Sequence, residues 1–96
     1  MTGEKKGVTY FLKEKRAIMG RSEKADIQIF DVKASREHIE LARVGNTYVL
    51  TDLKSQNGVM VNDLKVTQYT LKEGDKIIIG HTVYKFNDLK IDDVAK

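Results

Sequence analysis

Short apolar runs recur roughly every eight to twelve residues along the chain, and polar or glycine-containing turns separate them. In some runs apolar and polar side chains alternate, as in Ile39–Val44, and in others a few apolar residues are continuous, as in Ile77–Ile79. No apolar period of about 3.6 residues persists long enough to form an amphipathic helix. The pattern therefore predicts an all-β sandwich or barrel of short strands.

The individual runs give the expected strands. Val8–Leu12 is a short apolar run with two aromatic side chains, which predicts a strand buried on both faces. Gly45-Asn46 is expected to close Ile39–Val44 and Thr47–Leu53 into a hairpin. Val83–Asn87 is expected to be the last strand.

The chain of 96 residues suits one compact domain with a single core. Residues 1–7 are polar and are expected to form a flexible tail. The domain itself is expected to cover residues 8–87. Residues 88–96 are expected to be a C-terminal tail or a linker to a further domain, or to begin a short helix at Leu89.

The composition excludes several classes of site. The chain has no cysteine, which excludes disulfides and thiolate metal ligands, and its two histidines, His38 and His81, are too few for a zinc cluster. No apolar run is long enough to cross a bilayer, and residues 1–7 lack the hydrophobic region of a signal peptide. We therefore expect a cytoplasmic protein with no metal, no cofactor and no membrane partner.

The net charge of +3 arises in the first half of the chain. Met1–Thr51 contains 10 basic and 7 acidic residues, whereas Asp52–Lys96 contains 7 of each. Some of the basic residues fall in expected loops, namely Arg21, Lys24, Lys33 and Arg36. A modest excess on one rim suits a single anionic group better than a long polyanion such as nucleic acid.

The stretch Asp52–Asn62 changes abruptly from an apolar strand to a polar turn and then to a new strand. Asn57-Gly58 supplies residues that tolerate a positive φ, so the dipeptide marks a tight turn between strands. The Asn57 carboxamide offers a donor and an acceptor, the pair needed to hold an extended peptide backbone. Taken alone, an Asn-Gly pair more often only shapes its own turn and has no role in ligand binding.

Two other loops carry polar side chains with useful chemistry. Arg21 follows Gly20 at the end of a strand, and its guanidinium offers a planar fork of donors that matches phosphate oxygens. Ser35 offers a hydroxyl shortly before His38, which enters the next strand. Taken one at a time, these residues are typical of a solvated turn, a capping serine and a packed histidine.

The order of these residues resembles a known family. The segments that carry the resemblance are Gly20-Arg21, Ser35-Arg36-Glu37-His38, Asp52-Leu53, Ser55-Gln56-Asn57-Gly58, Val61-Asn62 and Gly74-Asp75-Lys76-Ile77-Ile78-Ile79-Gly80. Together they resemble the forkhead-associated (FHA) domain. The resemblance implies a β-sandwich of about eleven short, mainly antiparallel strands, with a site for phosphothreonine peptides on its apical loops.

The resemblance also implies roles for single residues. The phosphate-binding arginine of the family falls on Arg21 and its phosphate-binding serine on Ser35. Arg36 would contact peptide backbone or phosphate. Asn57 corresponds to the asparagine that hydrogen-bonds the peptide main chain.

Other matching positions have architectural roles in the family, and two positions depart from its pattern. Gly20, His38 and Gly58 match the architectural positions, with His38 bracing the loops. Gln56 stands where a small hydroxyl or basic residue is frequent, and its amide can still donate to a phosphate oxygen, more weakly than a charged group. Val59 replaces a frequent threonine and is expected to pack.

The implied function is that of a regulatory or recruitment domain, not an enzyme, in Ser/Thr kinase signalling. Its partner would be a phosphothreonine-containing protein, acted on by an upstream kinase. The phosphothreonine could also lie in the chain's own or a neighbour's tail, where Thr2 is a candidate, and an effector domain could follow Lys96.

Of three other interpretations, one stays open and two are disfavoured. The departures at Gln56 and Val59 leave open an FHA-like module that binds its partner without phosphate. A small β-barrel for single-stranded nucleic acid is disfavoured, because aromatic residues such as Tyr10 and Phe11 are expected to face the core. A hydrolase is disfavoured because no orienting acid or oxyanion site is specified.

Overall fold

The structure is a computed structural model that describes residues 9–87 and 89–94. Within these residues the chain forms eleven strands. In chain order they are β1 (Thr9–Phe11), β2 (Arg16–Gly20), β3 (Ile27–Gln28), β4 (Ile39–Val44), β5 (Thr47–Asp52), β6 (Val59–Val61), β7 (Leu64–Val66), β8 (Gln68–Thr70), β9 (Lys76–Ile79), β10 (Thr82–Asn87) and β11 (Lys90–Asp93).

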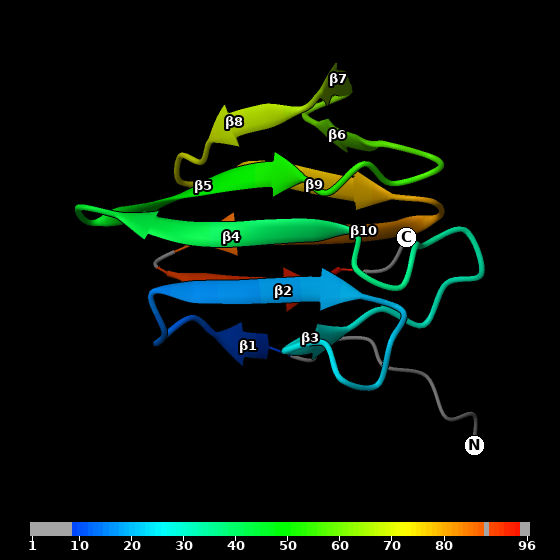
Figure 1. The fold of residues 1–96 in the computed structure, drawn as a ribbon. Coiled ribbons are helices and arrows are strands. Elements are labelled where there is room, and N and C mark those ends of the chain that lie inside the picture. The colour runs from blue at the N-terminus through cyan, green and yellow to red at the C-terminus, as the bar shows by residue number, and fades with distance from the viewer. Residues whose placement is uncertain (1–8, 88, 95–96) are drawn as a thin grey trace.

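The strands form two sheets that pack face to face (Figure 1). One sheet has six strands in the order β1-β11-β10-β9-β6-β7, and the other has five in the order β3-β2-β4-β5-β8. Neighbouring strands are antiparallel except β2 and β3, which run parallel. The all-β sandwich expected from the sequence is confirmed. The described part of the chain contains no helix that could span a membrane.

One hydrophobic core fills the space between the sheets. The rings of Tyr48 in β5 and Phe86 in β10 meet edge to face with their centroids 6.4 Å apart. The Tyr48 hydroxyl donates to the Glu14 carbonyl (2.7 Å), which satisfies the polar end of this buried side chain. Tyr84 and Phe86 are both buried, because alternate residues of a strand share a face.

Two hairpins are set by local turn chemistry. Gly45-Asn46 joins β4 to β5 as predicted, with Val44 paired to Thr47 and a φ of 64° at Gly45. β6 and β7 are joined by Asn62-Asp63, whose φ angles are 53° and 69°. Glycine adopts this left-handed region readily, and Asn and Asp tolerate it better than most other side chains, so these residues suit the two turns.

Three predictions about the ends of the domain are wrong. β1 is not buried on both faces, since it is an edge strand and the Phe11 side chain is 65% exposed. Lys90–Asp93 forms neither a short helix nor a linker, and Val83–Asn87 is not the last strand, because β11 pairs with both β1 and β10. β11 has a single fully buried side chain, Ile91, which is too little to mark a strand in the sequence. The predicted tail at residues 1–7 lies outside the described residues.

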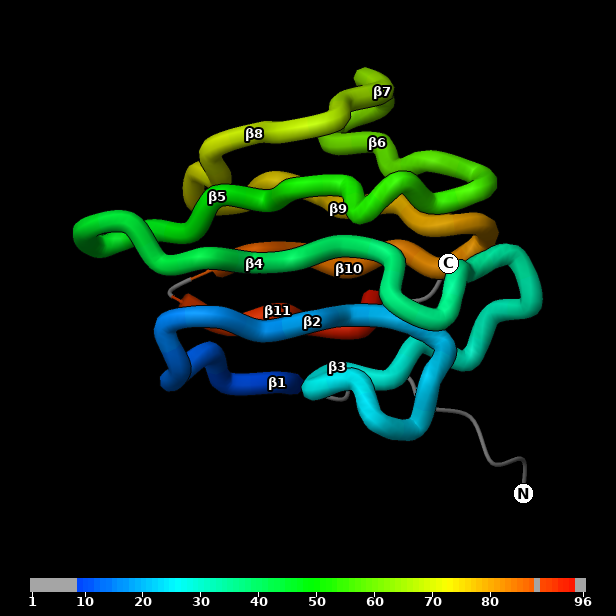
Figure 2. The backbone as a smooth tube through the Cα atoms, viewed as in Figure 1, coloured from blue at the N-terminus to red at the C-terminus, as the bar shows by residue number. Residues whose placement is uncertain are grey.

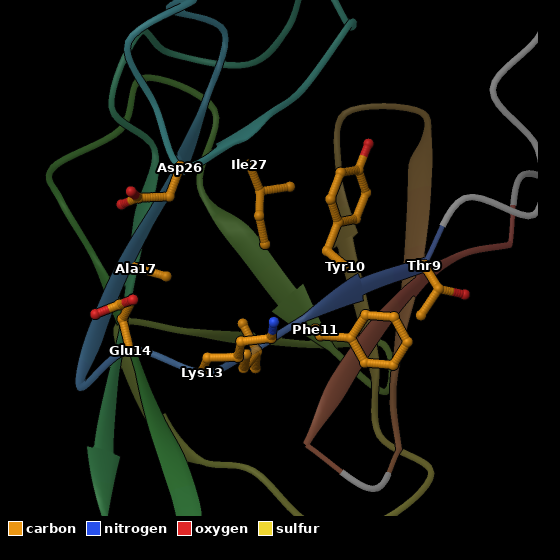
Figure 3. Close-up of a pocket in the computed structure, with 9 residues that line it drawn as sticks. Thr9, Tyr10, Phe11, Lys13, Glu14, Ala17, Asp26 and Ile27 are labelled. Atoms are coloured by element: carbon orange, nitrogen blue, oxygen red, sulfur yellow. The ribbon is translucent and has the colours of Figure 1, made fainter.

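The two edges of the sandwich differ. At one edge Thr67 alone separates β7 from β8, so the chain passes from one sheet to the other within a residue. At the other edge β1 and β3 border a hollow of about 460 Å³. Its lining includes Tyr10 and Phe11 from β1 and Ile27 from β3 (Figure 3). Phe11 therefore lies at an open edge rather than in the core.

Candidate functional site

The loops that carry the predicted site residues lie at one end of the sandwich. They are the connections β2–β3, β3–β4 and β5–β6, drawn in cyan, teal and green (Figure 2). The β4–β5 hairpin lies at the opposite end. Residues that are far apart in sequence therefore meet on one surface.

The close approach of two backbones positions Arg21. Its N–H donates to the Ser35 carbonyl (2.9 Å), and the Ser22 N–H donates to the Arg36 carbonyl (3.2 Å). A Cβ on Gly20 would lie only 2.0 Å from the Arg36 oxygen. Glycine is thus the residue that lets the end of β2 touch the β3–β4 loop.

The Arg21 side chain is exposed, and its Nε donates to the Ala34 carbonyl (2.9 Å). This bond fixes the base of the guanidinium, while Nη1 and Nη2 carry four further N–H donors. Arg21 and Arg36 line a hollow of about 290 Å³ together with Ser22 and Glu23. With two guanidinium groups and one carboxylate, the hollow favours an anion.

His38 joins two of the loops. The ring is fully buried, and its Nδ1 accepts the Ser35 N–H (2.9 Å). The proton therefore sits on Nε2, which donates to the Gly58 carbonyl (2.8 Å). The ring thus fixes the distance between the Ser35 backbone and the Asn57-Gly58 turn.

Ser35 contacts the third loop through its hydroxyl. Its Oγ accepts the backbone N–H of Gln56 (3.1 Å), and the hydroxyl hydrogen remains available as a donor. The Gln56 side chain is exposed. Gln56 therefore orients Ser35 through its main chain, a contact that its side-chain type does not indicate.

Asn57 is exposed, and its Nδ2 donates to the Lys33 carbonyl (2.7 Å). A carboxamide has a second N–H and a carbonyl oxygen for a ligand. Only Gly58 of the Asn-Gly pair has a positive φ, 79°. The predicted tight turn between strands is in fact a six-residue connection, Leu53–Gly58, that crosses from one sheet to the other. Val59 is buried, as expected for a packing residue.

An Asp-Ser pair, which was not predicted from the sequence, stabilises this connection. The Ser55 Oγ donates to the Asp52 carboxylate (2.5 Å) and accepts the Gly58 N–H (2.9 Å). Both contacts span three residues, so Asp-x-x-Ser before Asn-Gly was a local signal for them.

Asp31 was also missed. Its carboxylate accepts N–H groups from Lys33 (2.9 Å) and His81 (2.8 Å) and the Thr82 hydroxyl (2.9 Å), which ties the β3–β4 loop to the β9–β10 turn. Burial raises the pKa of this carboxyl, but these hydrogen bonds and the nearby His81 outweigh burial and lower the pKa below its ordinary value. The Lys33 contact is local, whereas no sequence signal links Asp31 to His81.

Comparisons with known proteins agree with this architecture. The FHA domain family model matches residues 17–80. The chain is 40% identical over 76 residues to the FHA domain-containing protein FhaA of Mycobacterium tuberculosis, which covers 79% of this chain and 14% of FhaA. It is 36% identical over 78 residues to an oxoglutarate dehydrogenase inhibitor of Corynebacterium jeikeium, covering 81% of this chain and 54% of the inhibitor. The chain thus spans only part of the curated relatives it matches.

A solved structure supports the same relationship. It was determined in a structural and functional analysis of phosphothreonine-dependent FHA domain interactions. It superposes with a TM-score of 0.71 at 33% identity, covering 88% of this chain and 81% of that one. The match to the family model and the sandwich of eleven described strands show that the chain belongs to the FHA domain family.

Proposed function

We propose that this chain binds phosphothreonine in a partner protein and acts as a regulatory or recruitment domain in Ser/Thr kinase signalling. The observation that carries the proposal is that Arg21, Ser35 and Asn57 lie on three loops that are joined by hydrogen bonds. These three residue types supply a cation, a hydroxyl and a carboxamide at one end of the fold.

The hollow beside Arg21 suits the phosphate. A phosphothreonine carries about −1.5 to −2 charges and three strong acceptor oxygens. The Arg21 fork can bind two oxygens at once, while Arg36 lines the same hollow and adds a second cation. The Ser35 hydroxyl can donate to a phosphate oxygen. The carboxylate of Glu23 would repel the phosphate, and a second cation beside Arg21 would offset this repulsion.

Asn57 suits the peptide rather than the phosphate. One of its N–H groups donates to the Lys33 carbonyl, so the side chain is held in one orientation. The second N–H and the carbonyl oxygen match the acceptor and donor of an extended peptide backbone. A fixed anion site beside a fixed backbone site would select a phosphorylated residue within an extended segment.

Relatives support a binding role without catalysis. One relative is named as an inhibitor of oxoglutarate dehydrogenase, and FHA domain interactions have been described as phosphothreonine-dependent. We accordingly propose that the phosphopeptide is bound and released unchanged. We also propose the cytoplasm as the compartment in which chain, partner and kinase meet. A mass spectrum of a phosphopeptide after incubation should show the phosphate still attached.

The test is a titration with degenerate phosphothreonine peptides and their unphosphorylated counterparts, measured by calorimetry. Arg21→Ala should weaken binding at least about 30-fold, because truncating one partner of a close charge pair costs about 2 to 5 kcal/mol. Lys13→Ala, at the β1 edge, is the matched control and should bind like the wild type. Equal binding by Arg21→Ala and wild type would refute the site. Equal binding of phosphorylated and unphosphorylated peptides would favour the phosphate-independent alternative.

A further inference from the structure

An apolar row crosses the outer face of the six-stranded sheet. Strand register places Met60 of β6 opposite Ile78 of β9, and Ile78 opposite Val83 of β10. The Val94 N–H donates to the Val83 carbonyl (2.9 Å), which adds Val94 to the row. We call Met60, Ile78, Val83 and Val94 the apolar row.

These side chains point away from the core. The residues on both sides of Met60 and of Ile78 are fully buried, and strand side chains alternate between the two faces of a sheet. Met60, Ile78 and Val83 are half-buried, and Val94 is 41% exposed. The sandwich has two layers, and no third layer of the described residues covers this face. A solvated face is ordinarily polar, so the row departs from that pattern.

The row is continuous with the candidate site. A hollow of about 410 Å³ is lined both by Asn57 and Gly58 of the β5–β6 connection and by Met60 and Ile78 of the row. Lys33 and His81 also line this hollow. A peptide held by Asn57 could therefore continue directly onto the row.

Basic side chains border the row at one end and along one side. Lys65 of β7 is paired with Met60 and lines the same hollow. In the next outward-facing positions Lys76 and Lys85 are paired with each other. The acid beside them, Asp92, accepts a hydrogen bond from the Thr9 hydroxyl (2.6 Å). This face thus favours an occupant that is apolar and bordered by acidic groups.

A second copy of the chain fits this face poorly. A two-fold pairing would place the same patch on both sides, so the interface would gather the lysine borders of both copies. Like charges gathered at one interface weaken association. The basic border therefore disfavours self-association through the row.

We propose that the apolar row and its lysine border form a second contact surface for the phosphorylated partner. It would bind an apolar segment flanked by Asp or Glu, next to the phosphothreonine. The inference rests on the proposed phosphothreonine binding. With strands about 4.8 Å apart, the five strand positions from Lys65 to Val94 span about 19 Å, or about six extended residues.

The test compares one short pool of phosphothreonine peptides with two extended pools. The short pool has degenerate positions on both sides of the phosphothreonine. The extended pools add about twelve residues of alternating Leu or Ile with Asp or Glu, on one side or the other, which is longer than the row. One extended pool should bind the wild type about tenfold more tightly than the short pool.

The variants are Val83→Lys and Val94→Lys, with Val44→Lys as the matched control. Val44 is 56% exposed on β4 of the other sheet. The first two should lose the tenfold gain and keep short-pool affinity, and Val44→Lys should keep both. Circular dichroism checks folding, and Val94→Lys, beyond the end of β11, preserves the test if Val83→Lys unfolds.

The outcomes separate the two proposals. If the short pool binds and neither extended pool binds more tightly, the second surface is overturned and the proposed function stands. If no pool binds, the proposed function fails and this inference fails with it. If sedimentation shows a dimer that Val83→Lys dissociates, the row is a self-association face and the inference is overturned.

Discussion

The two ends of the sandwich are stabilised in different ways. At the far end the β4–β5 hairpin turns over Gly45-Asn46, and the Arg43 Nε donates to the Gly45 carbonyl only two residues away (3.0 Å). At the site end the contact from Asn57 to Lys33 spans 24 residues, and that from His81 to Asp31 spans 50. The turn of the β4–β5 hairpin is thus stabilised by a local contact, whereas contacts between residues far apart in sequence join the loops of the site end.

This difference predicts that the site end is the more sensitive to substitution. The largest effect is expected for His38→Ala. It would leave a cavity and deprive the Ser35 N–H and the Gly58 carbonyl of their partner, which should cost about 3 to 5 kcal/mol of unfolding free energy. Urea denaturation measures the loss.

The control for this prediction is His81→Ala. The His81 side chain is exposed and its backbone N–H still bonds Asp31, so the change should stay within about 0.5 kcal/mol. Similar losses for the two histidine variants would show that His38 does not brace the loops.

Glycine-to-alanine substitutions compare the two ends directly. Gly20→Ala would force the Arg36 carbonyl to move, since the new Cβ would lie 2.0 Å from it, and should cost about 3 kcal/mol and weaken phosphopeptide binding. Gly45→Ala meets no neighbouring atom, and its φ of 64° should cost about 1 to 2 kcal/mol with binding unchanged. Thermal unfolding and peptide titration test both, and a binding loss in Gly45→Ala would contradict the comparison.

The same difference explains what the sequence could predict. Alternating apolar runs gave the all-β class, and Gly45-Asn46 gave the hairpin, because strand period and turn chemistry are local. The resemblance gave the positions of Arg21, Ser35 and Asn57. Their mutual contacts run through backbone atoms such as the Ala34 and Lys33 carbonyls, which carry no residue-type signal.

The errors have related physical causes. β11 was missed because pairing with β1 and β10, rather than its own composition, makes it a strand. Phe11 was expected in the core because aromatic residues are usually buried, yet an edge strand leaves one face open. The role of Asp31 depends on His81 and Thr82, which only the closed sandwich brings near.

Asp31 predicts how the site end responds to acid. Because its pKa is lowered in the folded state, it contributes stability above its ordinary pKa of about 4 and loses that contribution as the pH falls further. Asp31→Asn should therefore be less stable than wild type at neutral pH, with a difference that shrinks below about pH 4. Urea midpoints across this range measure it.

Thr82→Val is the companion variant, since it removes one of the three bonds to the carboxylate. It should lose less stability than Asp31→Asn at neutral pH. A difference between Asp31→Asn and wild type that is constant with pH would show that the hydrogen bonds do not favour the charged form.

The smallest expected effect is that of a substitution at Gln56, which tests whether a charged donor at the site end strengthens phosphopeptide binding. Its backbone N–H already orients the Ser35 hydroxyl, so the backbone contact should survive a change of side chain. Gln56→Arg would place a charged donor on an exposed position beside Ser35 and should tighten phosphopeptide binding about threefold to tenfold. The gain should shrink as salt is raised, because exposed charges are screened.

Asn46→Arg, at the hairpin of the far end, supplies the same charge away from the site and should leave affinity unchanged. Equal gains from the two arginines would mean that overall charge, rather than the geometry of the three loops, attracts the phosphate.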